Sequence, residues 1–299
     1  MKRILVALLG LVFSIANLTS TAAVAHPAKA GAESGKKYDL KYGLKDDSKF
    51  EVKTLRTDDA ETDMMGNKIL SKTESASDLA FRVKKSGKGA MVLEVAYKSK
   101  SLTIQAQGDT TSVDFSGLIG KMATFMLSGD GTAYDFKGFD SLPAIDIPSQ
   151  QTKIDQARYI LELKDLFPKL PGKPVAAGDT WTSTDVYKEP MSAAGGDSLT
   201  VTVTNTYTLV GPAQKDGVDC IEIRNNYTMS VAGSGKTQGM SLTIDMPGNG
   251  ATMIYFATGR GMFIGTEGSS IIKGTAVVQE AAVTIPMSHV YKTASTVIF

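Results

Sequence analysis

The chain has 299 residues, and its 32 Lys and Arg residues nearly balance its 31 Asp and Glu residues. This balance offers no basic surface to nucleic acid, so nucleic acid is excluded as a partner. The single cysteine, Cys220, excludes an internal disulfide, and only His26 and His289 are available as imidazole ligands. We therefore expect no metal site and no other cofactor.

The first 25 residues have the organisation of a secretory signal peptide. Lys2 and Arg3 precede an apolar run over residues 4–16, and small residues then lead to a cleavage position after Ala25. An uncleaved membrane anchor is the alternative, but this run is shorter than the roughly 20 residues that span a bilayer. We expect a cleaved signal peptide and a periplasmic or secreted protein. Loss of Lys2 and Arg3 would change the formal net charge from +1 to −1.

Short runs of alternating apolar residues dominate the rest of the chain and predict antiparallel strands with one buried face. Residues 38–44 alternate in this way. Two longer runs follow later: Leu199, Val201, Val203, Tyr207 and Leu209 share one parity, and so do Ile221, Ile223, Tyr227, Met229 and Val231. Glycine-containing turns are predicted at residues 128–131, 215–217, 247–250 and 259–261.

One segment departs from this pattern. Between Ser149 and Phe167 glycine is absent, and Ile154, Ala157 and Leu161 recur at helical spacing. This spacing predicts one amphipathic helix that ends before Pro168. A stiff, extended connector rich in proline follows it.

These signals predict a mainly β (α+β) fold with two curved antiparallel halves. The halves cover residues 37–147 and 174–299, the helix and Pro-rich connector occupy residues 148–173, and residues 26–36 form a flexible N-terminus. One continuous curved sheet wrapped on the helix is the alternative.

No sequence pattern indicates catalysis. The carboxylates at positions 58, 59, 61 and 63 lack the spacing of a calcium loop and are interpreted as a solvated acidic turn. His289 is accompanied by no nucleophile elbow and is interpreted as an ordinary strand residue. We expect a protein that is not an enzyme. A hydrolase with a hidden site and an outer-membrane barrel, suggested by the terminal Phe299, remain as alternatives.

Several short motifs, in this order, resemble a family of exported bacterial β-rich proteins that has no established activity. They are Tyr38-x-Leu40-Lys41-Tyr42, Met64-Met65-Gly66, Gly129-Asp130-Gly131, Phe167-Pro168 and Gly178-Asp179-Thr180-Trp181. The resemblance spans most of the mature chain and implies export and shape rather than a chemistry. More distantly, the expected curved sheet is similar to the periplasmic lipoprotein-carrier fold, whose concave face holds acyl chains. That analogy assigns no residue.

Trp181 is predicted to begin a strand and to anchor the C-terminal segment against the connector. Indole supplies a large apolar area together with one N–H donor that needs a partner.

The 13 methionines suggest a ligand site. Methionine fills irregular cores, and it also suits binding surfaces that adapt to their ligand. A gap between sheet and helix would be lined by Met91, Met122, Phe125, Met229 and Met253. This arrangement predicts binding of a lipid or other apolar ligand; core packing is the competing interpretation. We expect a non-catalytic envelope or periplasmic protein that binds such a ligand or an envelope protein partner, with a structural or adhesive surface module as the alternative.

Cleavage after Ala25 predicts that the mature protein begins at His26. Intact mass spectrometry of protein recovered from the periplasmic or culture fraction measures this directly. A mass that includes residues 1–25 would contradict the prediction.

Overall fold

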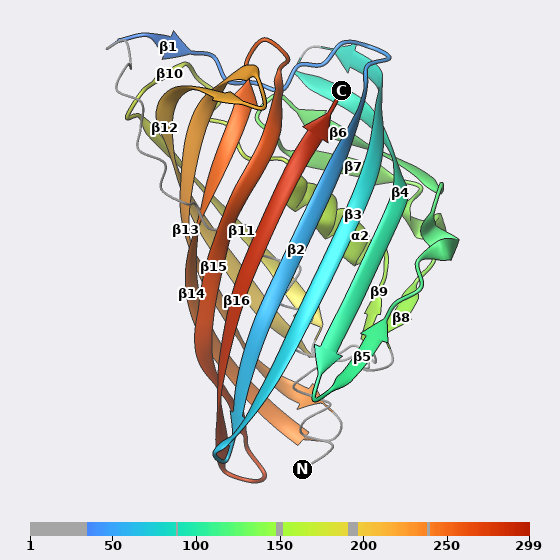
Figure 1. The fold of residues 1–299 in the computed structure, drawn as a ribbon, viewed down its shortest axis with the longest axis vertical. Coiled ribbons are helices and arrows are strands. Elements are labelled where there is room, and N and C mark those ends of the chain that lie inside the picture. The colour runs from blue at the N-terminus through green and yellow to red at the C-terminus, as the bar shows by residue number, and fades with distance from the viewer. Residues whose placement is uncertain (1–34, 88, 148–151, 191–196, 238–239) are drawn as a thin grey trace.

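The computed structural model shows one 12-stranded antiparallel sheet with two small two-stranded sheets beside it (Figure 1). It describes residues 35–87, 89–147, 152–190, 197–237 and 240–299. The predicted β-rich fold with antiparallel strands is confirmed.

The large sheet begins at one edge with strands from the C-terminal part of the chain and continues with strands from the N-terminal part. In spatial order these are β11 (Thr180–Pro190), β12 (Ser198–Lys215), β13 (Val218–Thr237), β14 (Met240–Ala257), β15 (Met262–Val278), β16 (Val283–Ile298), β2 (Lys49–Met64), β3 (Asn67–Gly87), β4 (Ala90–Ala106), β6 (Met122–Ser128) and β7 (Ala133–Lys137). Strand β5 (Asp109–Ser112) adds to β4. The small sheets pair β1 (Lys37–Tyr38) with β10 (Val175–Ala176) and β8 (Ile145–Ile147) with β9 (Thr152–Ile154). The helices are α2 (Gln156–Leu166) and the 3-10 turns η1 (Ser116–Leu118) and η2 (Phe139–Ser141).

Strands from both predicted halves belong to the same sheet. The last strand, β16, pairs with β2 over most of its length and so joins the C-terminal strands to the N-terminal ones. This pairing fits the alternative of one continuous curved sheet, and the division into two halves is not confirmed. Within the described residues, no helix is long and apolar enough to cross a membrane. The predicted signal peptide and N-terminal residues up to 34 lie outside the described residues.

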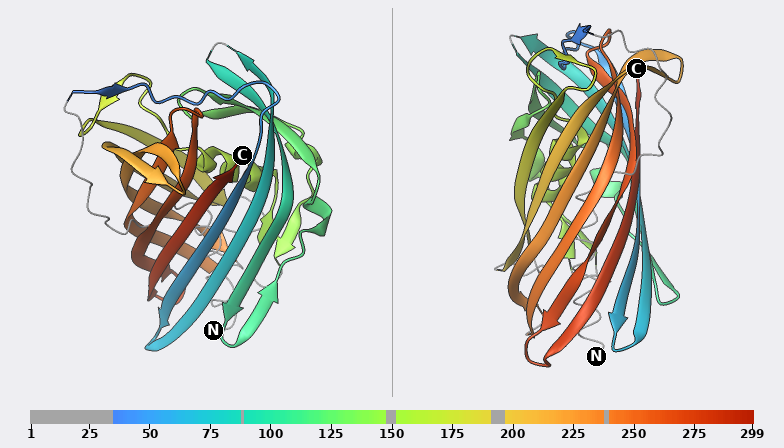
Figure 2. Two further views of the ribbon diagram at one scale, coloured as in Figure 1. Left: turned by 45° about the horizontal axis from the view of Figure 1, so that its top comes forward. Right: turned by 90° about the vertical axis from the view of Figure 1, so that its left-hand side faces the viewer.

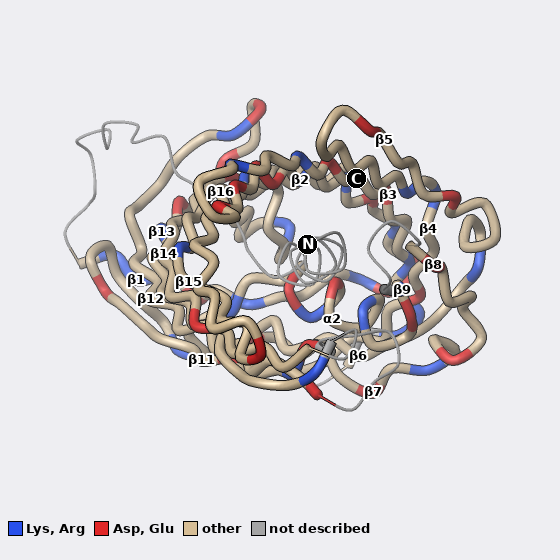
Figure 3. The backbone as a smooth tube through the Cα atoms, turned by 90° about the horizontal axis from the view of Figure 1, so that it is seen from below, with Lys and Arg blue, Asp and Glu red and all other residues tan. Residues whose placement is uncertain are grey.

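The large sheet is strongly curved but not closed. Seen along its strands it curls around an interior, while its edge strands β11 and β7 do not pair with each other (Figures 2 and 3). Helix α2 lies between these two ends, where it packs against β7 and η2 and where Arg158 forms an ion pair with Glu189 of β11. Helix α2 thus covers the side that the sheet leaves open. Open sheet edges expose unpaired backbone groups, and covering them with a helix is one way in which proteins protect such edges.

The helix is confirmed, but it begins later than predicted. Residues 152–154 form β9 instead, and Asp155 caps the helix by accepting the backbone N–H of Ala157 at 3.1 Å. Its buried side chains are Tyr159, Leu163 and Leu166. An Asp side chain at the N-cap satisfies a backbone donor that would otherwise lack a partner, and this fixes the start of the helix.

Inward-facing side chains form two apolar clusters at opposite ends of the interior. The first, called the aromatic cluster, surrounds Phe167, whose ring lies 5.8–6.1 Å from the rings of Tyr42, Phe81, Phe125 and Phe263. The second, called the aliphatic cluster, contains residues such as Val201, Met229, Ile244, Met246 and Ile272. Both clusters are almost fully buried, and together they form the core.

The turn predicted at residues 247–250 is wrong, because these residues lie within the long strand β14. Gly250 faces Tyr227 across the β13–β14 pair, and a Cβ atom there would lie 2.4 Å from the tyrosine hydroxyl oxygen. Gly248 is similarly close to β15, with Ile271 O at 2.8 Å from its would-be Cβ. These glycines therefore allow close packing inside the sheet rather than a change of direction.

Trp181 anchors β11 to the connector, as predicted. Its Nε1–H donates to the carbonyl oxygen of Lys169 at 2.9 Å, and its ring stacks on Tyr207 with centroids 5.3 Å apart. The indole therefore ties the edge of the sheet to the chain segment that follows α2.

Trp181→Ala should lower the free energy of unfolding by about 3 kcal/mol, because ring packing is lost and the Lys169 carbonyl loses its donor. Trp181→Phe keeps most of the ring contact and should cost only about 1 kcal/mol. Urea denaturation measures both changes. Val186→Ala, in the same strand at a position 63% exposed, should change stability by less than about 0.5 kcal/mol. A loss in Trp181→Ala no larger than in this control would contradict the anchoring role.

Candidate functional site

A belt of polar side chains separates the two apolar clusters on the inner face of the sheet. Along β12, for example, Val203 is followed at the next inward position by Asn205 and then by Tyr207, and all three are buried. Cross-strand partners continue the belt from strand to strand: Asn225 pairs with Thr252, Thr266 with Ser295, Ser295 with Thr54, Thr54 with Ser77, and Ser77 with Lys100. We call these residues, with Asn205, the polar belt.

A cavity lies between this belt and the end of α2. It has a volume of about 100 Å³, and we call it the chamber. The wall provided by the sheet is rich in amides and hydroxyls, from Asn205, Asn225, Thr252, Thr266, Thr293 and Ser295. The sheet also contributes charges and aromatic rings, from Arg56, Asp185, Tyr187 and Tyr207, and α2 with the segment after it contributes Lys164, Asp165, Phe167 and Lys169.

A chain of hydrogen bonds runs through the belt and ends at the chamber. Asn205 Nδ2 donates to Ser183 Oγ at 3.3 Å, and Asn225 Nδ2 donates to Asn205 Oδ1 at 2.8 Å. The remaining oxygen, Asn225 Oδ1, is buried and has no hydrogen-bond partner among the described residues, and the same holds for the hydroxyl of Tyr187. Both residues line the chamber. Buried polar groups are nearly always paired, so two unsatisfied atoms on residues that line one cavity are unusual.

Two carboxylates reach the chamber from different elements, Asp165 from α2 and Asp185 from β11. Burial raises the pKa of Asp165 to about 7; Arg56 opposes this shift, and the negative charge of Asp185 adds to it. The chamber therefore contains a carboxyl group that changes its protonation state near neutral pH.

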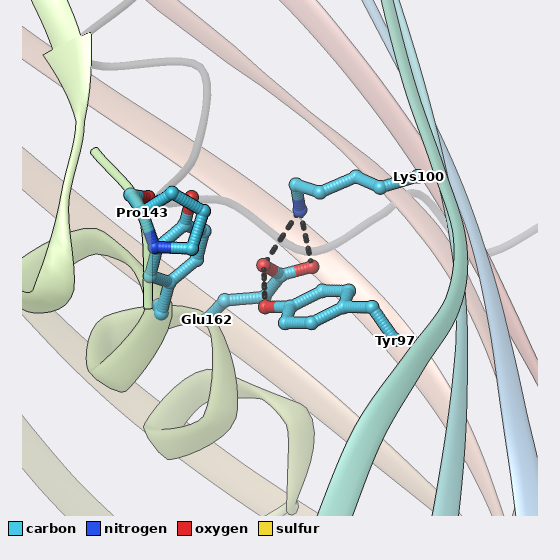
Figure 4. A network of polar contacts seen from close by, with 5 residues as sticks. Tyr97, Lys100, Pro143 and Glu162 are labelled. Atoms are coloured by element: carbon cyan, nitrogen blue, oxygen red, sulfur yellow. Dashed lines mark hydrogen bonds and ion pairs between the residues drawn. The ribbon is translucent and has the colours of Figure 1, made fainter. Parts of the chain in front are cut away.

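A second, smaller cavity of about 20 Å³ lies on the other side of Arg56, which lines both cavities. Here Glu162 of α2 meets β4 (Figure 4). Lys100 Nζ donates to both carboxylate oxygens of Glu162 at 2.7 and 2.9 Å, and the hydroxyl of Tyr97 donates at 2.7 Å. Burial by itself would raise the pKa of Glu162, but Lys100, Tyr97 and Arg56 together lower it. Glu162 is thus held as an anion that ties α2 to the sheet.

The other side of α2 carries a more deeply buried ion pair, between Arg158 and Glu189 of β11. Burial raises the pKa of Glu189 to about 7, although Arg158 opposes this shift. Burial likewise lowers the pKa of Arg158, and Glu189 opposes that shift. The helix is therefore linked by charge to β4 on one side and to the edge strand β11 on the other.

The interpretation of the acidic residues 58–63 as a solvated turn is wrong for Asp58. It faces inward from β2, is 3% exposed, and lies 3.2 Å from Nδ1 of His289, which is fully buried. Burial raises the pKa of Asp58, and His289 opposes this shift. Strand pairing between β2 and β16 brings these two residues together, so their contact joins segments far apart in the sequence.

The residues predicted to bind an apolar ligand lie apart from the chamber. Met91 and Phe125 belong to the aromatic cluster, and Met229 belongs to the aliphatic cluster. Met122 is 63% exposed, whereas Met253 is buried outside both clusters. None of them lines the chamber or the smaller cavity. The apolar site therefore stays a prediction.

The sequence analysis overlooked Asn205 and Asn225, although their signal is visible. Each sits within an apolar run and shares the parity of its buried neighbours. A polar residue at such a position must face the interior, and its hydrogen bonds must then be found inside the protein.

Glu189→Gln should flatten the pH dependence of stability. The pKa of Glu189 is about 7 in the folded protein against an ordinary value of 4.5. Between these values the folded state binds more protons than the unfolded state. The free energy of unfolding therefore falls as pH rises through this range, by up to about 3 kcal/mol from this group, and levels off above it. Asp165, whose pKa is also raised, acts in the same direction.

Urea denaturation at a series of pH values measures this slope. Glu267→Gln, at an exposed position on β15, should keep the slope of the unchanged protein. If Glu189→Gln kept it as well, Glu189 would not be the titrating group.

No protein-family model and no curated protein matches the chain. Among solved structures, the chain is similar to a Bacteroides fragilis protein described as a candidate exported protein with a YmcC-like fold. The two share 9% identity over 86% of this chain and 97% of that one, with a TM-score of 0.23. A likeness at this level supports no conclusion about the chain.

Proposed function

We propose that the chain is an exported, non-catalytic binding protein whose chamber holds a small ligand rich in hydroxyl groups. The signal-peptide pattern of residues 1–25 supports export. The observation that carries the binding proposal is the polar lining of the chamber, in which Asn225 and Tyr187 each keep a buried polar atom without a hydrogen-bond partner among the described residues.

The chemistry of the chamber favours hydroxyl groups. Amide and hydroxyl side chains both donate and accept hydrogen bonds, as the hydroxyl groups of a polyol or sugar do. Asn225 Oδ1 requires a donor, and the carboxylates of Asp165 and Asp185 accept further donors. An acyl chain would satisfy none of these groups, and each would lose its contact with water at a cost.

The size of the chamber limits the ligand. A water molecule needs about 10–15 Å³ by the same measure, so a volume of about 100 Å³ holds several waters. A small molecule, or one end of a longer one, would fill this space. The ligand would exchange those waters for direct hydrogen bonds, with orientation set by the fixed side chains of the sheet.

Asn225→Leu should weaken binding of the hydroxylated ligand at least about tenfold, because leucine has a similar size but leaves the ligand donor unpaired. A thermal-shift screen of the mature protein against monosaccharides, sugar alcohols and fatty acids identifies a ligand. Isothermal titration calorimetry then compares the variants.

Asn226→Leu is the matched control, since Asn226 neighbours Asn225 on the same strand but is exposed. It should leave affinity unchanged. Equal weakening in both variants would contradict a role of the chamber. Saturable binding of fatty acids with no binding of any hydroxylated compound would replace the proposal by the apolar-ligand prediction.

A further inference from the structure

The hairpin that joins β2 to β3 extends beyond the strands on either side of it. Strand β16 pairs with β2 only as far as Thr62, and β4 pairs with β3 only from Ser71 onward. In the described part of the chain, residues 63–70 therefore pair only within the hairpin, and we call them the hairpin tip. Figure 1 shows the turn between β2 and β3 at the lower end of the molecule, far from the C-terminus.

Apolar side chains of the hairpin tip are exposed to solvent. Met65 at the turn is 76% exposed and Leu70 on β3 is 64% exposed, which are the highest values among the large apolar residues that the structure describes. Ile69, on the other face of the hairpin, is half-buried. Neither Met65 nor Leu70 belongs to an apolar cluster, so neither contributes to the core.

The turn is an unusual place for a methionine. Met65 and Gly66 have φ angles of 56° and 87°, and a two-residue turn with two positive φ angles favours Asn, Asp or Gly at its first position. Two other hairpins of this chain have the same kind of turn, at Gln107-Gly108 and Asp216-Gly217, and both place a polar residue first. Met65 thus combines a strained backbone with an exposed apolar side chain, and neither property benefits the fold.

The charges of the hairpin tip are already neutralised. Lys68 Nζ lies 2.7 Å from Oε1 of Glu61, and Asp63 Oδ1 accepts the backbone N–H of Gly66 at 2.8 Å. Asp63 and Lys68 are the only charged residues between positions 63 and 70, and their formal charges cancel. The contact that this tip offers is therefore apolar rather than electrostatic.

The size and shape of the hairpin tip favour a membrane over a protein partner. A stable protein interface uses about 20–30 residues on each side, far more than residues 63–70 supply. A flat protein surface would also contact one face of the hairpin only. A bilayer surrounds a projecting tip, so it would reach Ile69 and Leu70 on opposite faces, and each apolar side chain that enters it leaves water.

We infer that the hairpin tip inserts Met65 and Leu70 into the surface of a lipid bilayer and so docks the protein on a membrane. Binding is reversible, because few apolar side chains enter the bilayer. It requires no anionic lipid, because the tip carries no net charge. This inference goes beyond the proposed function and does not depend on the chamber or its ligand.

Co-flotation of the mature protein with phosphatidylcholine vesicles tests this inference. The fraction of bound protein should rise with lipid concentration. Replacing about a third of the lipid by anionic phosphatidylglycerol should change the partition coefficient by less than about twofold, since apolar contact carries the binding.

Met65→Asn and Leu70→Thr should each weaken vesicle binding at least about fivefold, because each removes an inserted apolar side chain. Asparagine suits the left-handed turn position, so Met65→Asn should not lower the midpoint of thermal unfolding. Leu55→Thr is the matched control, because Leu55 is 55% exposed on β2 but lies within the paired part of the sheet. It should keep the partition coefficient within about twofold.

Absence of vesicle binding by the unchanged protein, or unweakened binding by both tip variants, would overturn the inference. An equal loss in Leu55→Thr would do the same. Self-association that Met65→Asn abolishes, measured by sedimentation equilibrium in the absence of any vesicle binding, would assign the tip to a second copy of the chain instead. None of these outcomes affects the proposed function, which ligand titration tests separately.

Discussion

Helix α2 covers the open side of the sheet and is held there by two ion pairs, a partly buried one to β4 and a deeply buried one to the edge strand β11. Glu162 binds Lys100 and Tyr97 of β4, and Arg158 binds Glu189 of β11. Forming a buried pair gains little, because both charges lose their water, whereas breaking one leaves an uncompensated charge in the interior. Moving α2 away would break both pairs. Displacing α2 from the open side of the sheet therefore carries the cost of two unpaired charges.

The polar belt has an energetic cost that the apolar clusters on either side do not share. Apolar residues at its positions would have joined the two clusters into one continuous core. Some belt groups recover their hydrogen bonds from one another, as Thr54 does with Ser295 and Asn225 with Asn205. Asn225 keeps one buried oxygen without a hydrogen-bond partner among the described residues, and this residue lines the chamber. A buried polar group without a partner carries a free-energy cost that a new hydrogen bond would remove.

Alternation of apolar residues was enough to predict the long strands and their buried parity, and side-chain size to predict the anchoring role of Trp181. The strand predicted at residues 38–44 is wrong beyond Tyr38, because only Lys37 and Tyr38 pair as β1, although Leu40, Tyr42 and Leu44 are buried. The chamber was not predicted, because it depends on pairing between strands far apart in sequence. Arg56 meets Thr293 only through the pairing of β2 with β16, and a shift of one residue would turn either side chain outward. The same pairing buries Asp58 against His289. Asn205 and Asn225 could have been predicted to face the interior, because each shares the parity of its buried apolar neighbours.

The chamber and the two ion pairs share one helix, which couples ligand binding to the closure of the sheet. Asp165 lies about one turn beyond Glu162 on α2, and Arg56 lies between the cavities beside these residues. A ligand in the chamber would lie beside both α2 and β11, from which Asp165 and Asp185 line the cavity. Such a ligand binds the closed arrangement and not the unfolded chain, so it stabilises the protein more as its concentration rises above its dissociation constant. The chamber lies between α2 and the sheet. A bound ligand would therefore stabilise the contact between these two elements.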